Sequence, residues 1–133
     1  MGTKRFDGWL TTAVLVHLLI SVLHGRAHDG GHVGLTPAQS LFVYIVILAG
    51  PIVGLGLSFA ARRVGGAVVA VTMGASLLFG VINHFIIVSP DHVSQVVPEF
   101  RTAFATTAVL LVVSEAAGMV AGLRSAVGRE VWS

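Results

Sequence analysis

Residues 65–88 read GGAVVAVTMGASLLFGVINHFIIV, a run without a single Asp, Glu, Lys or Arg. A helix needs about 20 predominantly apolar residues to cross the hydrocarbon core of a bilayer, and this run is long enough. Three other stretches are largely apolar as well, and short polar segments separate all four. We therefore predict an all-α fold, an integral membrane bundle of four transmembrane helices at about residues 8–28, 38–60, 65–88 and 101–123, forming a single domain over residues 1–133.

The composition of the chain supports a membrane protein. Of its 133 residues, 55% are hydrophobic and 11% are charged, with a mean hydropathy of +0.90, whereas soluble domains carry about 25% charged residues. The absence of cysteine excludes disulfide scaffolds, iron–sulfur clusters and cysteine-ligated zinc. With only eight Lys and Arg residues, the chain lacks the concentrated basic surface that phosphate binding requires, so we expect no nucleic-acid partner.

The basic residues predict the orientation of the chain in the bilayer. If the N-terminus is cytoplasmic, the cytoplasmic side holds six of the eight basic residues and the other side holds only Arg26 and Arg101. This asymmetry agrees with the positive-inside rule. We therefore predict a multi-pass protein of a prokaryotic cell membrane with both termini cytoplasmic. The six residues on that side are Lys4, Arg5, Arg62, Arg63, Arg124 and Arg129.

The histidines are the most informative polar residues of this apolar chain. At 100° per residue, His24 and His28 are rotated by about 20° in opposite directions from His17, so the three share one face of the first helix. His24 and His28 also have the i, i+4 spacing that lets two imidazoles reach one metal ion. His84 lies at nearly the same depth on the third helix, in the outer half of the membrane. Ionisable residues inside spans are costly, so this arrangement indicates a functional site.

We predict that His24, His28 and His84 form this site. The three imidazoles could converge on a transition-metal ion (Zn, Cu or Fe), with Asp91 or water as a fourth ligand. Alternatively, two of them could be the axial ligands of haem b, which requires a flat cavity about 10 Å across. Hydrogen bonding between helices is the purely structural interpretation of the same residues. The polar residues predicted to surround the ligands are Asp29, His32, Asn83, Asp91 and His92.

A second buried polar group is predicted nearer the cytoplasmic side. Glu115 shares a face of the fourth helix with Leu111 and Gly118, so it is expected to face the interior of the bundle. His17 is the ionisable residue nearest to it in depth. A hydrogen bond between the two would lower the cost of burying either group and would hold the first and fourth helices together. A proton path leading inward from the outer histidines and a contact of Glu115 with a partner protein are the alternative interpretations.

Three hypotheses about function follow from these residues. The first is metal or haem binding in the membrane, in electron transfer or metal handling. The second is a non-catalytic subunit of a larger membrane complex, whose partners would be other membrane-protein subunits or further copies of this chain. The third is a membrane enzyme that acts on a lipid-like or quinone substrate. The sequence contains no His-Glu-x-x-His motif, so zinc-protease chemistry is unsupported and the question of enzymatic activity stays open.

The predicted orientation can be tested with a topology reporter fused after Ser133. Because the basic residues favour the cytoplasmic side by six to two, the reporter should be active only when it is of the type that works in the cytoplasm. Activity confined to a reporter that works in the external compartment would overturn the prediction.

Overall fold

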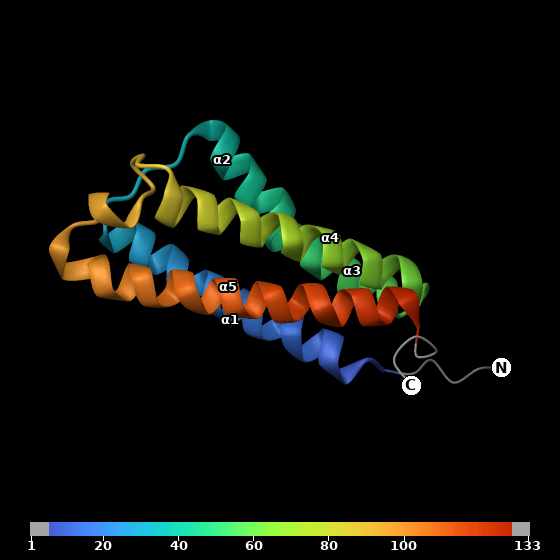
Figure 1. Cartoon of the computed structure of the whole chain (residues 1–133). Coiled ribbons are helices and arrows are strands. Elements are labelled where there is room, and N and C mark those ends of the chain that lie inside the picture. The colour runs from blue at the N-terminus through green and yellow to red at the C-terminus, as the bar shows by residue number, and fades with distance from the viewer. Residues whose placement is uncertain (1–5, 129–133) are drawn as a thin grey trace.

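The computed structural model describes residues 6–128, and nearly all of this part of the chain is helical. Four helices are long and apolar enough to cross a membrane, which confirms the predicted fold class (Figure 1). No strand occurs within residues 6–128. The elements are α1 (Gly8–Gly30), α2 (Pro37–Phe42), the π-helix η1 (Val43–Ala49), α3 (Gly50–Ser58), α4 (Arg62–Val81), the π-helix η2 (Ile82–Ile86), the 3₁₀-helix η3 (Val93–Gln95) and α5 (Pro98–Val127).

The helices begin where the sequence supplies caps. The Asp7 side chain accepts a hydrogen bond from the Leu10 amide at 3.1 Å and so caps the start of α1. Thr36 and Gln39 form a capping box at the start of α2, with Pro37 in the first turn. Pro98 likewise stands in the first turn of α5, which therefore begins three residues before the predicted boundary at residue 101.

The second span is an interrupted helix, as the proline in its middle predicts. Pro51 has no amide hydrogen, so the carbonyl of Ile47 loses the donor that a regular α-helix would supply. The backbone just before this point is the π-helix η1, which runs from Val43 to Ala49. Such wide turns are rare and often occur at functional sites. In Figure 1, α2 diverges from the other helices on the far side of this interruption.

The helices pack through small residues, as expected where lipid gives them no hydrophobic reason to associate. α5 lies against both α1 and α4, and α4 also packs against α3. Gly66 of α4 and Gly122 of α5 meet so closely that a Cβ on Gly122 would lie 2.7 Å from the Gly66 carbonyl oxygen and 2.6 Å from the Ala70 nitrogen. Farther along α4 from Gly66, a buried apolar core joins α4 to α1 through Leu10, Val14, Val69 and Met73.

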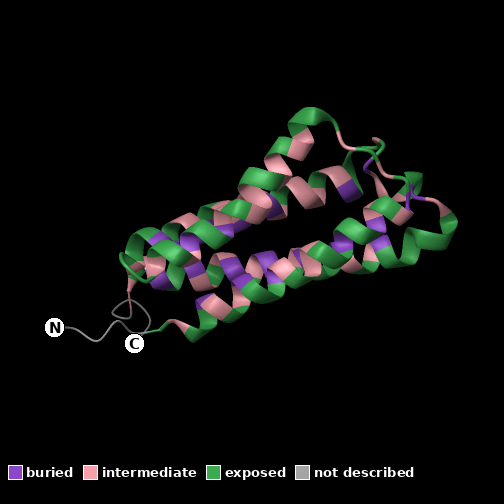
Figure 2. Cartoon of the chain, turned by 180° about the vertical axis from the view of Figure 1, so that it is seen from behind, coloured by how far each residue is buried: buried purple, intermediate pink, exposed green. Residues whose placement is uncertain are grey.

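Buried residues gather where the helices face one another, and the outward faces are exposed and apolar (Figure 2). Leu19, Val71 and Ile86 are among the large side chains on these exposed faces. This pattern suits a hydrocarbon environment, because the outward side chains are apolar and all backbone polar groups of a helix are satisfied internally. α1 begins and α5 ends at the same end of the molecule (Figure 1). We call the opposite end, with the connections 31–36 and 87–97, the loop end.

The close approach of α4 and α5 predicts different effects for two glycine substitutions. Gly122→Ala should lower the free energy of unfolding by about 1–3 kcal/mol, because its methyl group would meet the backbone of α4. Gly56→Ala is the matched control, since a Cβ there has nothing within 4 Å, and alanine is the better helix former. Reversible unfolding in bicelles measures both. Equal stabilities of the two variants would contradict the packing described here.

Candidate metal centre

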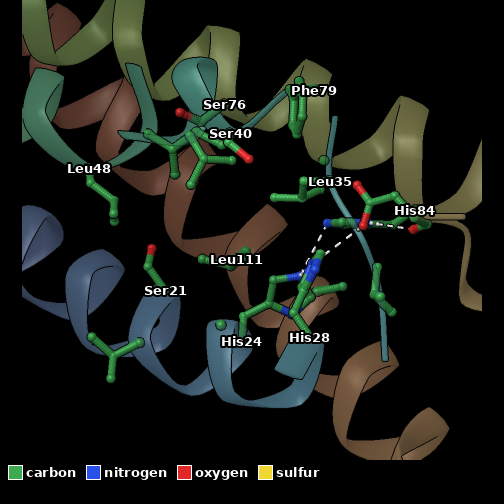
Figure 3. A pocket seen from close by; sticks show the side chains of 18 of the residues that line it. Ser21, His24, His28, Leu35, Ser40, Leu48, Ser76, Phe79, His84 and Leu111 are labelled. Atoms are coloured by element: carbon green, nitrogen blue, oxygen red, sulfur yellow. Dashed lines mark hydrogen bonds and ion pairs between the residues drawn. The ribbon is translucent and has the colours of Figure 1, made fainter. Parts of the chain in front are cut away.

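Three imidazoles converge at the loop end of the bundle. His24 and His28 lie one turn apart on α1, and His84 lies on η2. The Nε2 atom of His24 lies 3.1 Å from Nε2 of His84 and 3.2 Å from Nε2 of His28. One nitrogen from each ring lies within 4.8 Å of the other two, and the rings point toward one another (Figure 3). The structure thus brings together the three histidines that the sequence predicted as ligands.

An aromatic side chain covers this cluster on the side of α5. The ring of Phe104 lies 4.8 Å from that of His24 and 5.0 Å from those of His28 and His84, measured between centroids. Phe104 is completely buried, as His24 and His84 nearly are. Packing of this kind fixes ring orientations and keeps the site dry. The sequence analysis missed this role, although Phe104 shares a helical face with Leu111 and Glu115.

The other nitrogen of two of these rings is held by a hydrogen-bond acceptor. His84 Nδ1 lies 3.1 Å from the carbonyl oxygen of Asp91, which can only accept, so Nδ1 carries the hydrogen. His24 Nδ1 lies 2.8 Å from the hydroxyl oxygen of Thr107. That hydroxyl donates its own hydrogen to the carbonyl of Ala103 at 2.7 Å, so it accepts from His24. Thr107 is a second residue that the sequence analysis missed.

These hydrogen bonds determine the tautomers of His24 and His84. In a neutral imidazole only one nitrogen carries a hydrogen, so a donating Nδ1 leaves a lone pair on Nε2. The two Nε2 lone pairs then face each other across 3.1 Å. This contact is unfavourable unless a positive charge lies between them. Either a metal ion or an additional proton would supply that charge.

Asp91 places a buried carboxyl group beside the cluster. Its Oδ1 atom lies 3.3 Å from Nδ1 of His84 and 3.4 Å from Nε2 of His28. Asp91 is 1% exposed, and among residues 6–128 neither carboxylate oxygen has a hydrogen bond of good geometry. Within the same residues its ion-pair contacts are to imidazoles, with no Lys or Arg. When ionised, a buried carboxyl group in such surroundings requires a compensating cation.

Three of the other predicted surrounding residues, Asn83, His32 and His92, have other partners or surroundings in the structure. Asn83 accepts a hydrogen bond from Gln39, and His92 caps η3 through the Ser94 amide. His32 is exposed and adopts a left-handed backbone conformation with φ of 56°, because α1 ends at Gly30 and the chain turns there. Asp29 is exposed, although it lines the same pocket as the cluster.

The predicted pair of His17 and Glu115 lies deeper in the bundle. Nδ1 of His17 is 3.9 Å from Oε1 of Glu115, which places the pair in contact but beyond hydrogen-bonding length. Nε2 of His17 donates to the carbonyl of Ile47 at 2.9 Å. This carbonyl is the one that Pro51 leaves without its α-helical donor. The interruption of the second span therefore holds His17 in place and turns its Nδ1 toward Glu115.

One pocket joins the two polar groups. A cavity of about 490 Å³ is lined by His24, His28 and His84 and extends to Glu115. Leu48 and Leu111 line it beyond the histidines (Figure 3). The cluster therefore lies at the side of a space large enough for a small organic molecule.

Comparison with known proteins gives no relative: no family model, no curated protein and no solved structure matches the chain. The chemistry of the site must therefore be inferred from its own residues. Those residues are three converging imidazoles, two fixed tautomers and a buried carboxylate.

The contact between His17 and Glu115 predicts non-additive effects in a double-mutant cycle. Each single change, His17→Ala or Glu115→Ala, leaves the other polar group buried without its neighbour, so the two effects should deviate from additivity by about 0.5–2 kcal/mol. The free energy of unfolding in bicelles measures each variant. His92→Ala combined with Glu115→Ala is the control and should be additive. Strict additivity for His17 and Glu115 would show that they do not interact.

Proposed function

We propose that this protein is a multi-pass membrane protein that binds a transition-metal ion through Nε2 of His24, His28 and His84. The observation that carries the proposal is the contact between the Nε2 atoms of His24 and His84, whose lone pairs face each other across 3.1 Å. A metal ion uses both lone pairs as ligands and removes their repulsion. The other nitrogen of each ring, Nδ1, donates a hydrogen bond, from His24 to Thr107 and from His84 to the Asp91 carbonyl. Metal-binding histidines are typically oriented by a hydrogen bond of this kind.

The distances favour a bare ion over a haem. Tetrahedral coordination with metal–nitrogen bonds of about 2.0–2.1 Å places ligand nitrogens about 3.3–3.4 Å apart. The separations of 3.1 and 3.2 Å are close to this value. Axial imidazoles of a haem bind opposite faces of the iron, so their nitrogens are about 4 Å apart with a porphyrin between them. The Nε2 atoms of His24 and His84, only 3.1 Å apart, leave no room for a porphyrin plane between them.

The nature of the ligands restricts the choice of metal. Imidazole nitrogen suits Zn, Cu, Fe and Ni, and the chain has no thiolate that would select a softer ion. The Asp91 carboxylate supplies a negative charge that balances part of the charge of a divalent cation. We therefore expect a divalent ion, with zinc and copper as the first ions to test.

The ligand number supports an exchangeable site. Structural zinc sites have four protein ligands, whereas three protein ligands leave one position for water or substrate. Here three imidazoles converge, and the cavity of about 490 Å³ adjoins them. This arrangement favours metal-dependent binding or conversion of a small molecule over the electron-transfer and subunit hypotheses.

The metal site can be tested by elemental analysis of the purified protein after dialysis against zinc or copper. We expect one ion per chain in the wild type and none in His24→Ala or His84→Ala. Thr107→Val removes the acceptor that holds His24 but preserves the side-chain shape, so it should weaken binding about 10- to 100-fold. His92→Ala is the matched control, because His92 only caps η3, and it should bind like the wild type.

Two outcomes would contradict the proposal. If the wild type binds no ion at any of the concentrations tested, an additional proton rather than a metal lies between His24 and His84. If His84→Ala keeps the wild-type stoichiometry, η2 contributes no ligand and the site as described is wrong. Circular dichroism of each variant shows that loss of the ion does not result from unfolding.

A further inference from the structure

A second polar group, in addition to the histidines, lines the cavity. Glu115 lines it about two helical turns from the histidines, because His17, its neighbour, precedes His24 by seven residues on α1. Between these two places the walls are mostly apolar and include Ile47, Leu48 and Leu111. Exposed residues of α1 and η1, Val22 and Tyr44, also line the cavity, so it opens sideways between the first and second spans. An opening there faces the hydrocarbon of the bilayer.

Glu115 is a buried carboxyl group with an unused hydrogen-bond acceptor. The residue is 2% exposed, and its Oε2 atom has no hydrogen-bond partner among residues 6–128. Ser21 and Ser76 are among the hydroxyl residues that line the same cavity, but Ser21 donates its hydrogen to the His17 carbonyl and Ser76 donates to the Thr72 carbonyl. An unpartnered oxygen of this kind is costly away from water. Something in the cavity must donate a hydrogen to it.

This requirement holds both when the proton of the pair is on Oε1 of Glu115 and when it is on His17. Nε2 of His17 carries a hydrogen, because it is bonded to the Ile47 carbonyl. The side of the ring that faces Glu115 is therefore Nδ1. If Glu115 is a carboxylic acid with its proton on Oε1, the oxygen that lies 3.9 Å from Nδ1, then Oε2 is an acceptor. If the proton has moved to His17, both carboxylate oxygens are acceptors. In each case Oε2 requires a donor.

We propose that the cavity binds a lipid-soluble molecule with a neutral hydroxyl group, which enters from the bilayer and donates a hydrogen bond to Glu115. Its apolar body would lie between the first and second spans against Ile47, Leu48 and Leu111. A carboxylate ligand lacks the donor and would face a second acidic group, and an ether or alkane also lacks the donor. The proposal goes beyond metal binding, because the hydroxyl subsite contains none of the three histidines of the metal centre.

Competition against a photoreactive long-chain alcohol, with the protein in lipid nanodiscs, tests this inference. The competitors are 1-dodecanol and its methyl ether, which share an apolar chain and differ in the donor. We expect dodecanol to compete about tenfold better in the wild type, as one hydrogen bond to a buried acceptor predicts. Mass spectrometry of the labelled protein should place the crosslinks on α1, η1 and α5. A long-chain phenol in a third arm shows whether an aromatic or a linear body is preferred.

Two substitutions of Glu115 separate the hydrogen bond from the shape of the cavity. Glu115→Gln should keep the preference for the alcohol, because the amide NH₂ group can face His17 while the amide oxygen accepts from the ligand. Glu115→Leu removes the acceptor, so the alcohol and the ether should compete equally. His24→Ala should keep the preference, and this result would hold even if no metal binds to the protein. Failure of the metal site and failure of the hydroxyl site are thus distinguishable.

Either of two results would overturn the proposal. Equal competition by alcohol and ether in the wild type would mean that a water molecule, and not a ligand hydroxyl, satisfies Oε2. An undiminished preference in Glu115→Leu would place the hydroxyl elsewhere in the cavity. Far-ultraviolet circular dichroism in the same nanodiscs verifies that each variant is folded.

Discussion

Inside a bilayer there is no water to satisfy a polar group, and this constraint governs every polar feature of the molecule. The backbone meets it by forming helices over almost the whole described chain. Where Pro51 breaks the pattern, the freed carbonyl of Ile47 receives its hydrogen bond from His17. A side chain on the first span thus repairs a defect in the second, and the repair determines which nitrogen of His17 faces Glu115.

The absence of water inside a bilayer also means that the polar atoms of the histidine cluster need partners within the protein. Thr107 and the Asp91 carbonyl take the Nδ1 hydrogens of His24 and His84, and this leaves two Nε2 lone pairs in contact. Among residues 6–128, these bonds leave this pair of lone pairs without a donor, and the Asp91 carboxylate has no hydrogen-bond partner either. Both groups are negative or electron-rich, so a single cation would resolve them together. The proposed metal ion is that cation.

The two polar centres differ in what they lack, although they share one cavity. The histidine cluster lacks a positive charge, whereas Glu115 lacks a hydrogen-bond donor. A metal ion meets the first need and a hydroxyl group meets the second. The opening between α1 and η1 gives both centres access to a molecule dissolved in the bilayer. This arrangement relates most closely to the hypothesis of a membrane protein that acts on a lipid-soluble compound through a metal ion.

Much of this architecture could be predicted from the sequence, because it depends on local periodicity. Apolar runs of about 20 residues predict the four helices, and the 100° rotation per residue places His17, His24 and His28 on one face. Depth in the bilayer follows from position along a helix, so His84 could be paired with His24, and Glu115 with His17. These inferences need only the rise and rotation of a helix.

The remaining features were decided by the tertiary structure, because they depend on how helices are rotated against one another and on loop conformation. Phe104 and Thr107 meet the imidazoles only through the rotation of α5 against α1. The connection after η2 turns Asp91 inward and leaves His92 to cap η3. His32 is carried away where α1 ends, although it is four residues from His28. The cavity exists because η1 and α2 diverge from α1, a result of packing between distant segments that no local pattern records.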